Sequence, residues 1–126
     1  MEPKKIDTKD YTIYFGEAGY KYLAAYIKEK KYSKIFVLSD THTHECCVYA
    51  FLQRLPFEVE VIEVEAGEEH KNLETCLSLW QTLSDLEGDR KSLLINIGGG
   101  VVTDMGGFVA STFMRGIDFI NIPTSL

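Results

Sequence analysis

The sequence predicts an α/β domain in which a parallel β-sheet is covered by helices on both faces. Short apolar runs alternate with stretches of helical periodicity along the chain, a pattern typical of β-α-β units with right-handed crossovers. Two of the runs, within 34–39 and 93–97, are nearly continuous, as in parallel strands buried on both faces. The length of 126 residues, with 45% hydrophobic and 25% charged residues, suits one globular domain.

The first half of the chain is predicted to alternate three strands with two helices. Gly16 stops the first strand, and Pro56 ends the second helix because proline cannot continue it. In order, the elements are a strand over 11–15, a helix over 17–31, a strand over 34–39, a helix over 43–55 and a strand over 57–64.

The second half is predicted to hold two helices and two strands. Gly88 is expected to cap the first of these helices, and Arg115 with Gly116 breaks the second. In order, the elements are a helix over 73–86, a strand over 93–97, a helix over 102–114 and a strand over 117–122.

Composition and charge exclude several classes of partner. The net charge of -6 argues against nucleic acid, and no run reaches the roughly 20 apolar residues that span a bilayer. The first residues lack the apolar core of a signal peptide, so we expect a cytoplasmic protein. The three cysteines, Cys46, Cys47 and Cys76, match no disulfide framework or zinc spacing and are expected to be reduced. His42 and His44 are poorly spaced for one metal, and we expect no metal site in these residues.

Three glycines, Gly98, Gly99 and Gly100, follow the strand over 93–97 and precede a helix. They remove every Cβ where the backbone turns, and they leave the first N–H groups of the helix bare. Those donors and the positive end of the helix dipole suit a pyrophosphate. The alternative is a tight strand-to-helix turn that binds nothing.

Four other positions each allow a functional and a structural interpretation. Asp40 ends a strand, where Rossmann-like domains hold the adenosine ribose, but aspartate also caps helices well. Asp104, expected in the first turn of its helix, either stabilises the dipole or selects a ribose or amide of a ligand. Lys71 and Glu68 lie in a charged loop that is either solvated or contacts a phosphate and a ribose. Arg115 either interacts with the end of a helix or binds a substrate phosphate or carboxylate.

Residues 98–116, together with Pro123-Thr124-Ser125-Leu126, resemble the central signature of the 3-dehydroquinate synthase family. Ser39-Asp40 and Gly67-Glu68-Glu69-His70-Lys71 support the resemblance upstream. His42, Thr103 and Ser125 depart from the family, which often has asparagine, glycine and threonine there. The resemblance implies that Arg115 reaches the substrate, and it assigns no catalytic residue within this chain. The residues that it implies contact NAD are Asp40, Glu68, Lys71, Gly99, Gly100, Val101, Asp104, Thr124 and Ser125.

The resemblance also implies an activity for the whole protein. The family converts 3-deoxy-D-arabino-heptulosonate 7-phosphate to 3-dehydroquinate and phosphate in the shikimate pathway of aromatic amino acid biosynthesis. This carbon–oxygen lyase reaction uses NAD catalytically and a divalent metal, zinc or cobalt, held by a helical second domain. The family's full-length enzymes are expected to be homodimers.

The chain stops directly after a strand, so we expect residues 1–126 to be the N-terminal NAD-binding domain of a larger enzyme. The helical metal and substrate domain would then be absent, and the fragment by itself inactive. The alternatives are another sugar-phosphate cyclase, an iron-dependent alcohol or glycerol dehydrogenase, or a chain that only binds nucleotide.

Overall fold

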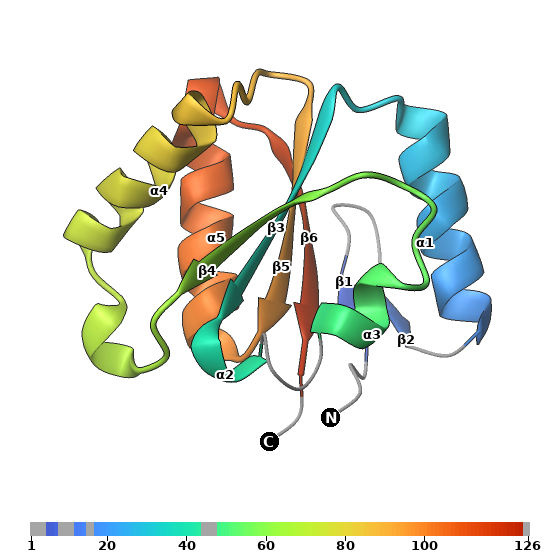
Figure 1. The fold of residues 1–126 in the computed structure, drawn as a ribbon, viewed down its shortest axis with the longest axis horizontal. Helices are drawn as coiled ribbons and strands as arrows, with labels where there is room; N and C mark the ends of the chain where they lie inside the picture. Colours follow the sequence, from blue (N-terminus) through green and yellow to red (C-terminus); the bar gives the residue numbers. More distant parts are fainter. Residues whose placement is uncertain (1–4, 8–11, 15–16, 44–47, 125–126) are drawn as a thin grey trace.

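The computed structural model describes residues 5–7, 12–14, 17–43 and 48–124, and it contains one six-stranded sheet (Figure 1). The strand order is β2-β1-β6-β5-β3-β4. The four strands β6, β5, β3 and β4 are parallel, as predicted, whereas β1 pairs antiparallel with both β2 and β6. The strands are β1 (Lys5–Asp7), β2 (Thr12–Tyr14), β3 (Lys34–Asp40), β4 (Glu60–Val64), β5 (Ser92–Gly98) and β6 (Asp118–Pro123).

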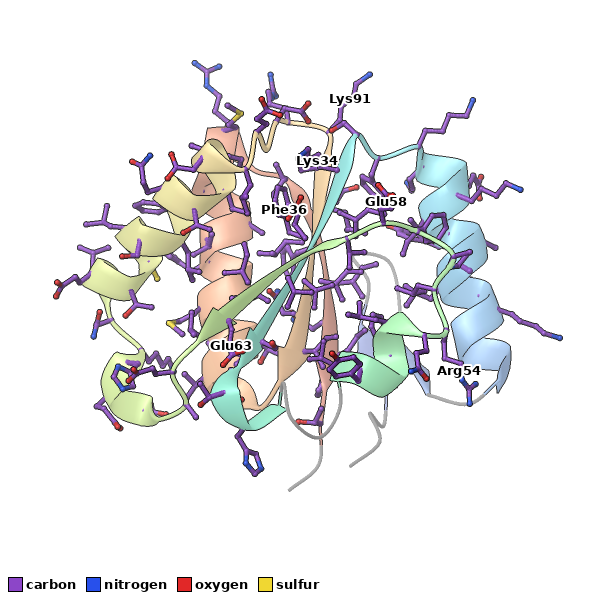
Figure 2. The ribbon with its side chains drawn as sticks, in the orientation of Figure 1. Lys34, Phe36, Arg54, Glu58, Glu63 and Lys91 are labelled. Atoms are coloured by element: carbon purple, nitrogen blue, oxygen red, sulfur yellow. The ribbon has the colours of Figure 1, made fainter. Side chains whose placement is uncertain are left out.

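Helices cover both faces of the sheet. They are α1 (Glu17–Lys30), α2 (Thr41–Thr43), α3 (Tyr49–Leu52), α4 (Leu73–Asp85) and α5 (Gly100–Thr112), with 3-10 turns η2 (Glu68–His70) and η3 (Phe113–Arg115). On one face, α1 and the segment around α3 pack Leu23, Ile27 and Phe51 against the sheet. On the other face, α4 and α5 pack against Phe36 and Leu38 of β3. Figure 2 shows Phe36 along β3 and Lys34 at the amino end of the same strand.

The predicted helix over 43–55 is wrong in extent. The structure has the short helices α2 and α3 there, and residues 44–47 lie outside the described residues. After α3 the hydrogen bonds join residues three apart, as in a 3-10 helix. Arg54 N donates to Phe51 O at 3.1 Å, and Leu55 N donates to Leu52 O at 3.2 Å. The helix therefore ends before Pro56 is reached.

The left-handed residue that follows α4 lies one position before the predicted Gly88. Glu87 takes the left-handed conformation, with φ of 65°, and Gly88 N donates to Leu83 O at 2.8 Å. Together with the bond from Glu87 N to Ser84 O at 3.0 Å, this bond forms a Schellman motif in which Gly88 is the second residue after the cap residue Leu86. Glycine is needed there for space, because a Cβ on Gly88 would lie 2.9 Å from Leu83 O.

Helix α5 begins at Gly100, two residues before the predicted start. It ends at Thr112, and three residues with positive φ then turn the chain into β6: Met114 (48°), Arg115 (70°) and Gly116 (113°). The break predicted at Arg115 and Gly116 is confirmed, and β6 runs parallel to β5 beside it.

Candidate functional site

The carboxyl ends of the four parallel strands meet at one edge of the sheet, which is the lower edge in Figure 1. Asp40 ends β3, Gly98 ends β5, and Thr124 follows β6. Thr124 N donates to Gly98 O at 3.0 Å, which ties the end of β6 to the glycine turn. Because Ser39 pairs with Ile97 in register, Asp40 also lies beside this turn.

The glycine turn places the N-terminus of α5 at this edge. Gly99 precedes the helix in an extended conformation, with φ of -82° and ψ of -167°, and glycine has no side chain to cap the first N–H groups. A Cβ on Gly99 or Gly100 would meet nothing within 4 Å. Among the described residues the space beside the turn is therefore open, and their packing does not require glycine at either position. This combination suits an anionic ligand that approaches the backbone closely.

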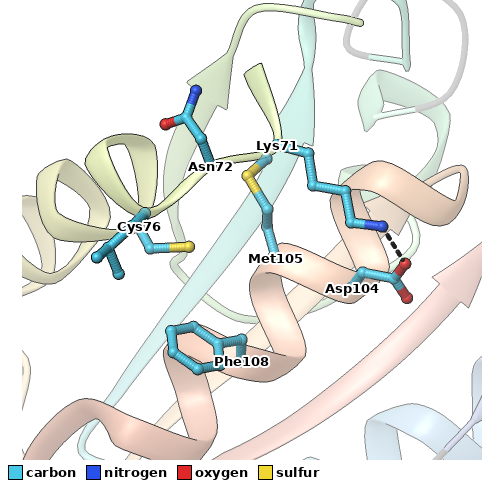
Figure 3. Close-up of a pocket in the computed structure, with 7 residues that line it drawn as sticks. Lys71, Asn72, Cys76, Asp104, Met105 and Phe108 are labelled. Atoms are coloured by element: carbon cyan, nitrogen blue, oxygen red, sulfur yellow. Dashed lines mark hydrogen bonds and ion pairs between the residues drawn. The ribbon is translucent and has the colours of Figure 1, made fainter. Parts of the chain in front are cut away.

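Lys71 joins the loop after β4 to helix α5 (Figure 3). Its Nζ donates to Asp104 Oδ2 at 2.9 Å and lies 3.9 Å from Glu68 Oε1. The hydrogen bond to Asp104 raises the pKa of Lys71, and the charges of Asp104 and Glu68 raise it further. Three residues predicted to contact the cofactor, Glu68, Lys71 and Asp104, are thus brought together. Asp104 lies 33 or more positions along the chain from the other two.

Asp104 does not lie in the first turn of α5, so the dipole interpretation of this residue is wrong. The helix begins at Gly100, which makes Asp104 its fifth residue, and no acidic residue stands in the first turn. Helix dipole effects fall off within that turn. The contact with Lys71 is the interaction that the structure gives this carboxylate.

A pocket of about 250 Å³ lies between α4 and α5, next to this ion pair. Leu73, Cys76, Met105 and Phe108 form its apolar wall, and Lys71 with Asp104 lies at its rim (Figure 3). Cys76 is a free, buried thiol, as expected, and burial raises its pKa. The sequence interpretation missed the pocket. Two of its apolar lining residues are exposed, Phe108 by 48% and Leu73 by 62%.

Arg115 is not brought to this edge. It precedes β6, whereas Gly98 and Thr124 lie at the other ends of β5 and β6. The 13 residues of α5 separate the two positions by about 20 Å. Within this chain, Arg115 therefore lies at the end of the sheet opposite the glycine turn, and its contact with a substrate stays a prediction.

The loop after β4, which carries Glu68 and Lys71, is held beside the end of β3. Ala66 N in this loop donates to Thr41 Oγ1 at 3.2 Å.

The other predicted positions lie in or near α5 and α2, or outside the described residues. Val101 is the second residue of α5 and is half-buried, and His42 is exposed in α2. Ser125, His44, Cys46 and Cys47 lie outside the described residues.

Within the described ranges, no three histidine, cysteine, aspartate or glutamate side chains are placed to hold a metal ion. No helix in the part of the chain that the structure describes has the length and apolar character to cross a membrane.

Comparison with known proteins identifies the family. The model of the 3-dehydroquinate synthase N-terminal family matches residues 61–126, which include the Lys71 loop and the glycine turn. The chain belongs to the 3-dehydroquinate synthase N-terminal family. A 3-dehydroquinate synthase of Parabacteroides distasonis is 42% identical to this family member over 106 residues, covering 82% of the chain and 30% of the relative. One from Acetivibrio thermocellus is 38% identical, covering 96% of the chain and 34% of the relative.

A solved structure also resembles this family member closely. The crystal structure of 2-deoxy-scyllo-inosose synthase complexed with carbaglucose-6-phosphate, NAD+ and Co2+ matches with a TM-score of 0.78 and 26% identity. The match covers 98% of this chain and 35% of that one. The chain thus spans about a third of the length of the relatives that it matches.

Proposed function

We propose that this chain binds NAD at the carboxyl edge of its sheet, with the pyrophosphate on the Gly99–Gly100 turn. The observation that carries the proposal is the bare N-terminus of α5, which faces open space over two glycines. Backbone N–H groups and the helix dipole both favour a phosphate there. The arrangement of the neighbouring polar side chains fits a dinucleotide.

The polar residues around the turn supply the other contacts in this proposal. Asp40, at the end of β3, accepts hydrogen bonds from the adenosine ribose. Lys71 exchanges its contact with Asp104 for a phosphate oxygen, which leaves Asp104 to accept from an amide or hydroxyl of the ligand. Glu68, Val101, Thr124 and Ser125 complete the proposed set.

We further propose that the whole protein is a 3-dehydroquinate synthase that acts on 3-deoxy-D-arabino-heptulosonate 7-phosphate. Bound NAD supplies transient oxidation of a substrate hydroxyl, and the residues of this chain hold and orient the cofactor. The divalent metal, zinc or cobalt, is held by residues other than the described ones, among which no three-ligand group exists. As the resemblance implies, the full-length enzyme is a homodimer, and Arg115 contacts its substrate. We place the enzyme in the cytoplasm, in line with the first residues, which lack the apolar core of a signal peptide.

Calorimetric titration of NAD into the chain tests the cofactor proposal, and absence of binding would refute it. The activity is tested on the whole enzyme with the heptulosonate phosphate, NAD and zinc or cobalt, by assay of inorganic phosphate. The 126-residue chain alone is expected to release none. Metal-dependent phosphate release by that chain would overturn this division of roles.

A second candidate is another sugar-phosphate cyclase, and the likeness to 2-deoxy-scyllo-inosose synthase favours it. A whole enzyme that binds NAD but leaves the heptulosonate phosphate unchanged would support this alternative. Net accumulation of NADH with an alcohol substrate would instead indicate a dehydrogenase.

A further inference from the structure

Asn96 is a polar residue in the middle of a fully buried strand. Every residue of β5 is buried, and Asn96 itself has no exposed surface. Its Nδ2 donates to Asn121 Oδ1 on the neighbouring strand at 3.0 Å. Its Oδ1 has no hydrogen-bond partner among the residues that the structure describes. A buried amide oxygen without a partner is unfavourable, so an apolar residue would be expected here if the position served the core alone.

Gly106 of α5 lies directly over the Asn96 carboxamide. A Cβ at position 106 would overlap the oxygen and carbon of that group and lie 2.6 Å from its nitrogen. Ordinary contact begins at 3.4 Å, so either the helix or the amide would have to move. The amide is held by Asn121, and protein interiors leave little free volume for it to turn aside.

We propose that Asn96 is a positioning residue: its carboxamide, fixed by Asn121, sets where α5 sits on the sheet and so where the Gly99–Gly100 turn presents its N–H groups. Gly106 stands six residues after Gly100, about 9 Å along the same helix. A short, regular helix carries a displacement at Gly106 to its N-terminus. Displacements of about 1 Å in a site can lower function about 100-fold.

The inference rests on the proposed dinucleotide site, so the experiment has one readout that needs NAD and one that does not. The first is the NAD dissociation constant by calorimetry. The second is the fluorescence of Trp80, the only tryptophan of the chain. Trp80 lies on α4, and its Nε1 donates to Thr112 Oγ1 of α5 at 3.0 Å. Its emission therefore reports how α5 is seated.

Three variants of the chain are compared, each at a temperature where circular dichroism shows it folded. Gly106→Ala creates the overlap, and Gly106→Ala with Asn96→Ala removes it. Gly107→Ala is the matched control, because its Cβ would make an ordinary contact of 3.6 Å with the Phe119 ring.

We expect Gly106→Ala to raise the NAD dissociation constant at least tenfold and to shift the Trp80 emission. In the double variant the methyl group at position 106 takes the space that the Asn96 carboxamide leaves, so α5 should keep its height above the sheet. The NAD dissociation constant should then return to within about threefold of the wild-type value, and the Trp80 emission should return to the wild-type spectrum. Gly107→Ala should change neither. Wild-type values for Gly106→Ala, or a defect that persists in the double variant, would overturn the inference. If Gly106→Ala does not fold, folding of the double variant supports the inference and its failure overturns it.

If the wild-type chain binds no NAD, the proposed function fails. The Trp80 comparison then still decides whether Asn96 seats the helix.

Discussion

The two open glycines allow the effect of a side chain on ligand binding to be separated from its effect on folding. Gly99→Val and Gly100→Ala each add atoms where a Cβ would meet nothing within 4 Å. Helical Cβ atoms tilt toward the N-terminus, so alanine at Gly100 points toward the proposed pyrophosphate. Neither added Cβ contacts another described part of the chain.

The two variants should change stability in opposite directions and NAD affinity in the same direction. Gly99 holds the N-cap position, where valine is disfavoured, so Gly99→Val should lower the free energy of unfolding by about 0.5–1 kcal/mol. Gly100 is helical, and alanine there should raise that free energy by up to about 1 kcal/mol, a few degrees in Tm. Both should weaken NAD binding at least tenfold, about 1.4 kcal/mol.

Calorimetry for NAD and urea unfolding for stability measure the two effects in the same preparations. Gly107→Ala, on the same helix but away from the turn, serves as the control that should bind NAD normally. Unchanged NAD affinity in folded Gly99→Val and Gly100→Ala would refute the assignment of the pyrophosphate to this turn. Affinity that follows stability would indicate an effect on folding alone.

Three further predictions concern other parts of the chain. Asp40→Ala should weaken NAD binding and raise the affinity for NADP relative to that for NAD, because a carboxylate repels a 2′-phosphate. An equal loss of affinity for both cofactors, together with a lower Tm, would indicate that Asp40 serves as a helix cap instead. Glu87→Gly should raise the free energy of unfolding by about 0.5–1 kcal/mol, since it relieves a left-handed residue, and a decrease in urea unfolding would contradict this. The hydrogen bond from Ser33 lowers the pKa of Asp89, so that bond stabilises the fold above the ordinary aspartate pKa and loses its effect as pH falls. Ser33→Ala should therefore lower the urea midpoint at neutral pH, and the difference from wild type should shrink in acid.

The parallel part of the fold could be predicted because its strands and helices carry their own periodicity. Lys34–Asp40 and Ser92–Gly98 are apolar enough to indicate burial on both faces. In contrast, β1 spans only Lys5–Asp7, has no local pattern, and depends on pairing with β2 and β6. A three-residue strand of this kind is defined by tertiary contacts, which the sequence alone does not reveal.

The site was predicted in its components but not in its arrangement. The glycine turn, Lys71 and Asp104 each have a local signal, yet the contact between Lys71 and Asp104 joins residues that are 33 positions apart. A helix that starts at residue 102, as the sequence predicts, has Asp104 in its first turn, whereas α5 begins at Gly100. Glycine is a poor helix former, so its place in the first turn of α5 has no signal in the sequence. The length of the predicted helix argues against a place for Arg115 beside the glycine turn, because such a helix carries the chain back to the opposite end of the sheet.

The edge strand β4 has a consequence for behaviour at high concentration. An uncovered sheet edge offers unpaired N–H and C=O groups to another molecule, which can lead to aggregation. Glu58, Glu60, Glu63 and Glu65 are exposed along and beside this strand, and only Val61 interrupts them as an exposed apolar residue. Like charges on two such edges repel each other and oppose their pairing. At high protein concentration, this repulsion should keep two copies of the chain from pairing through β4.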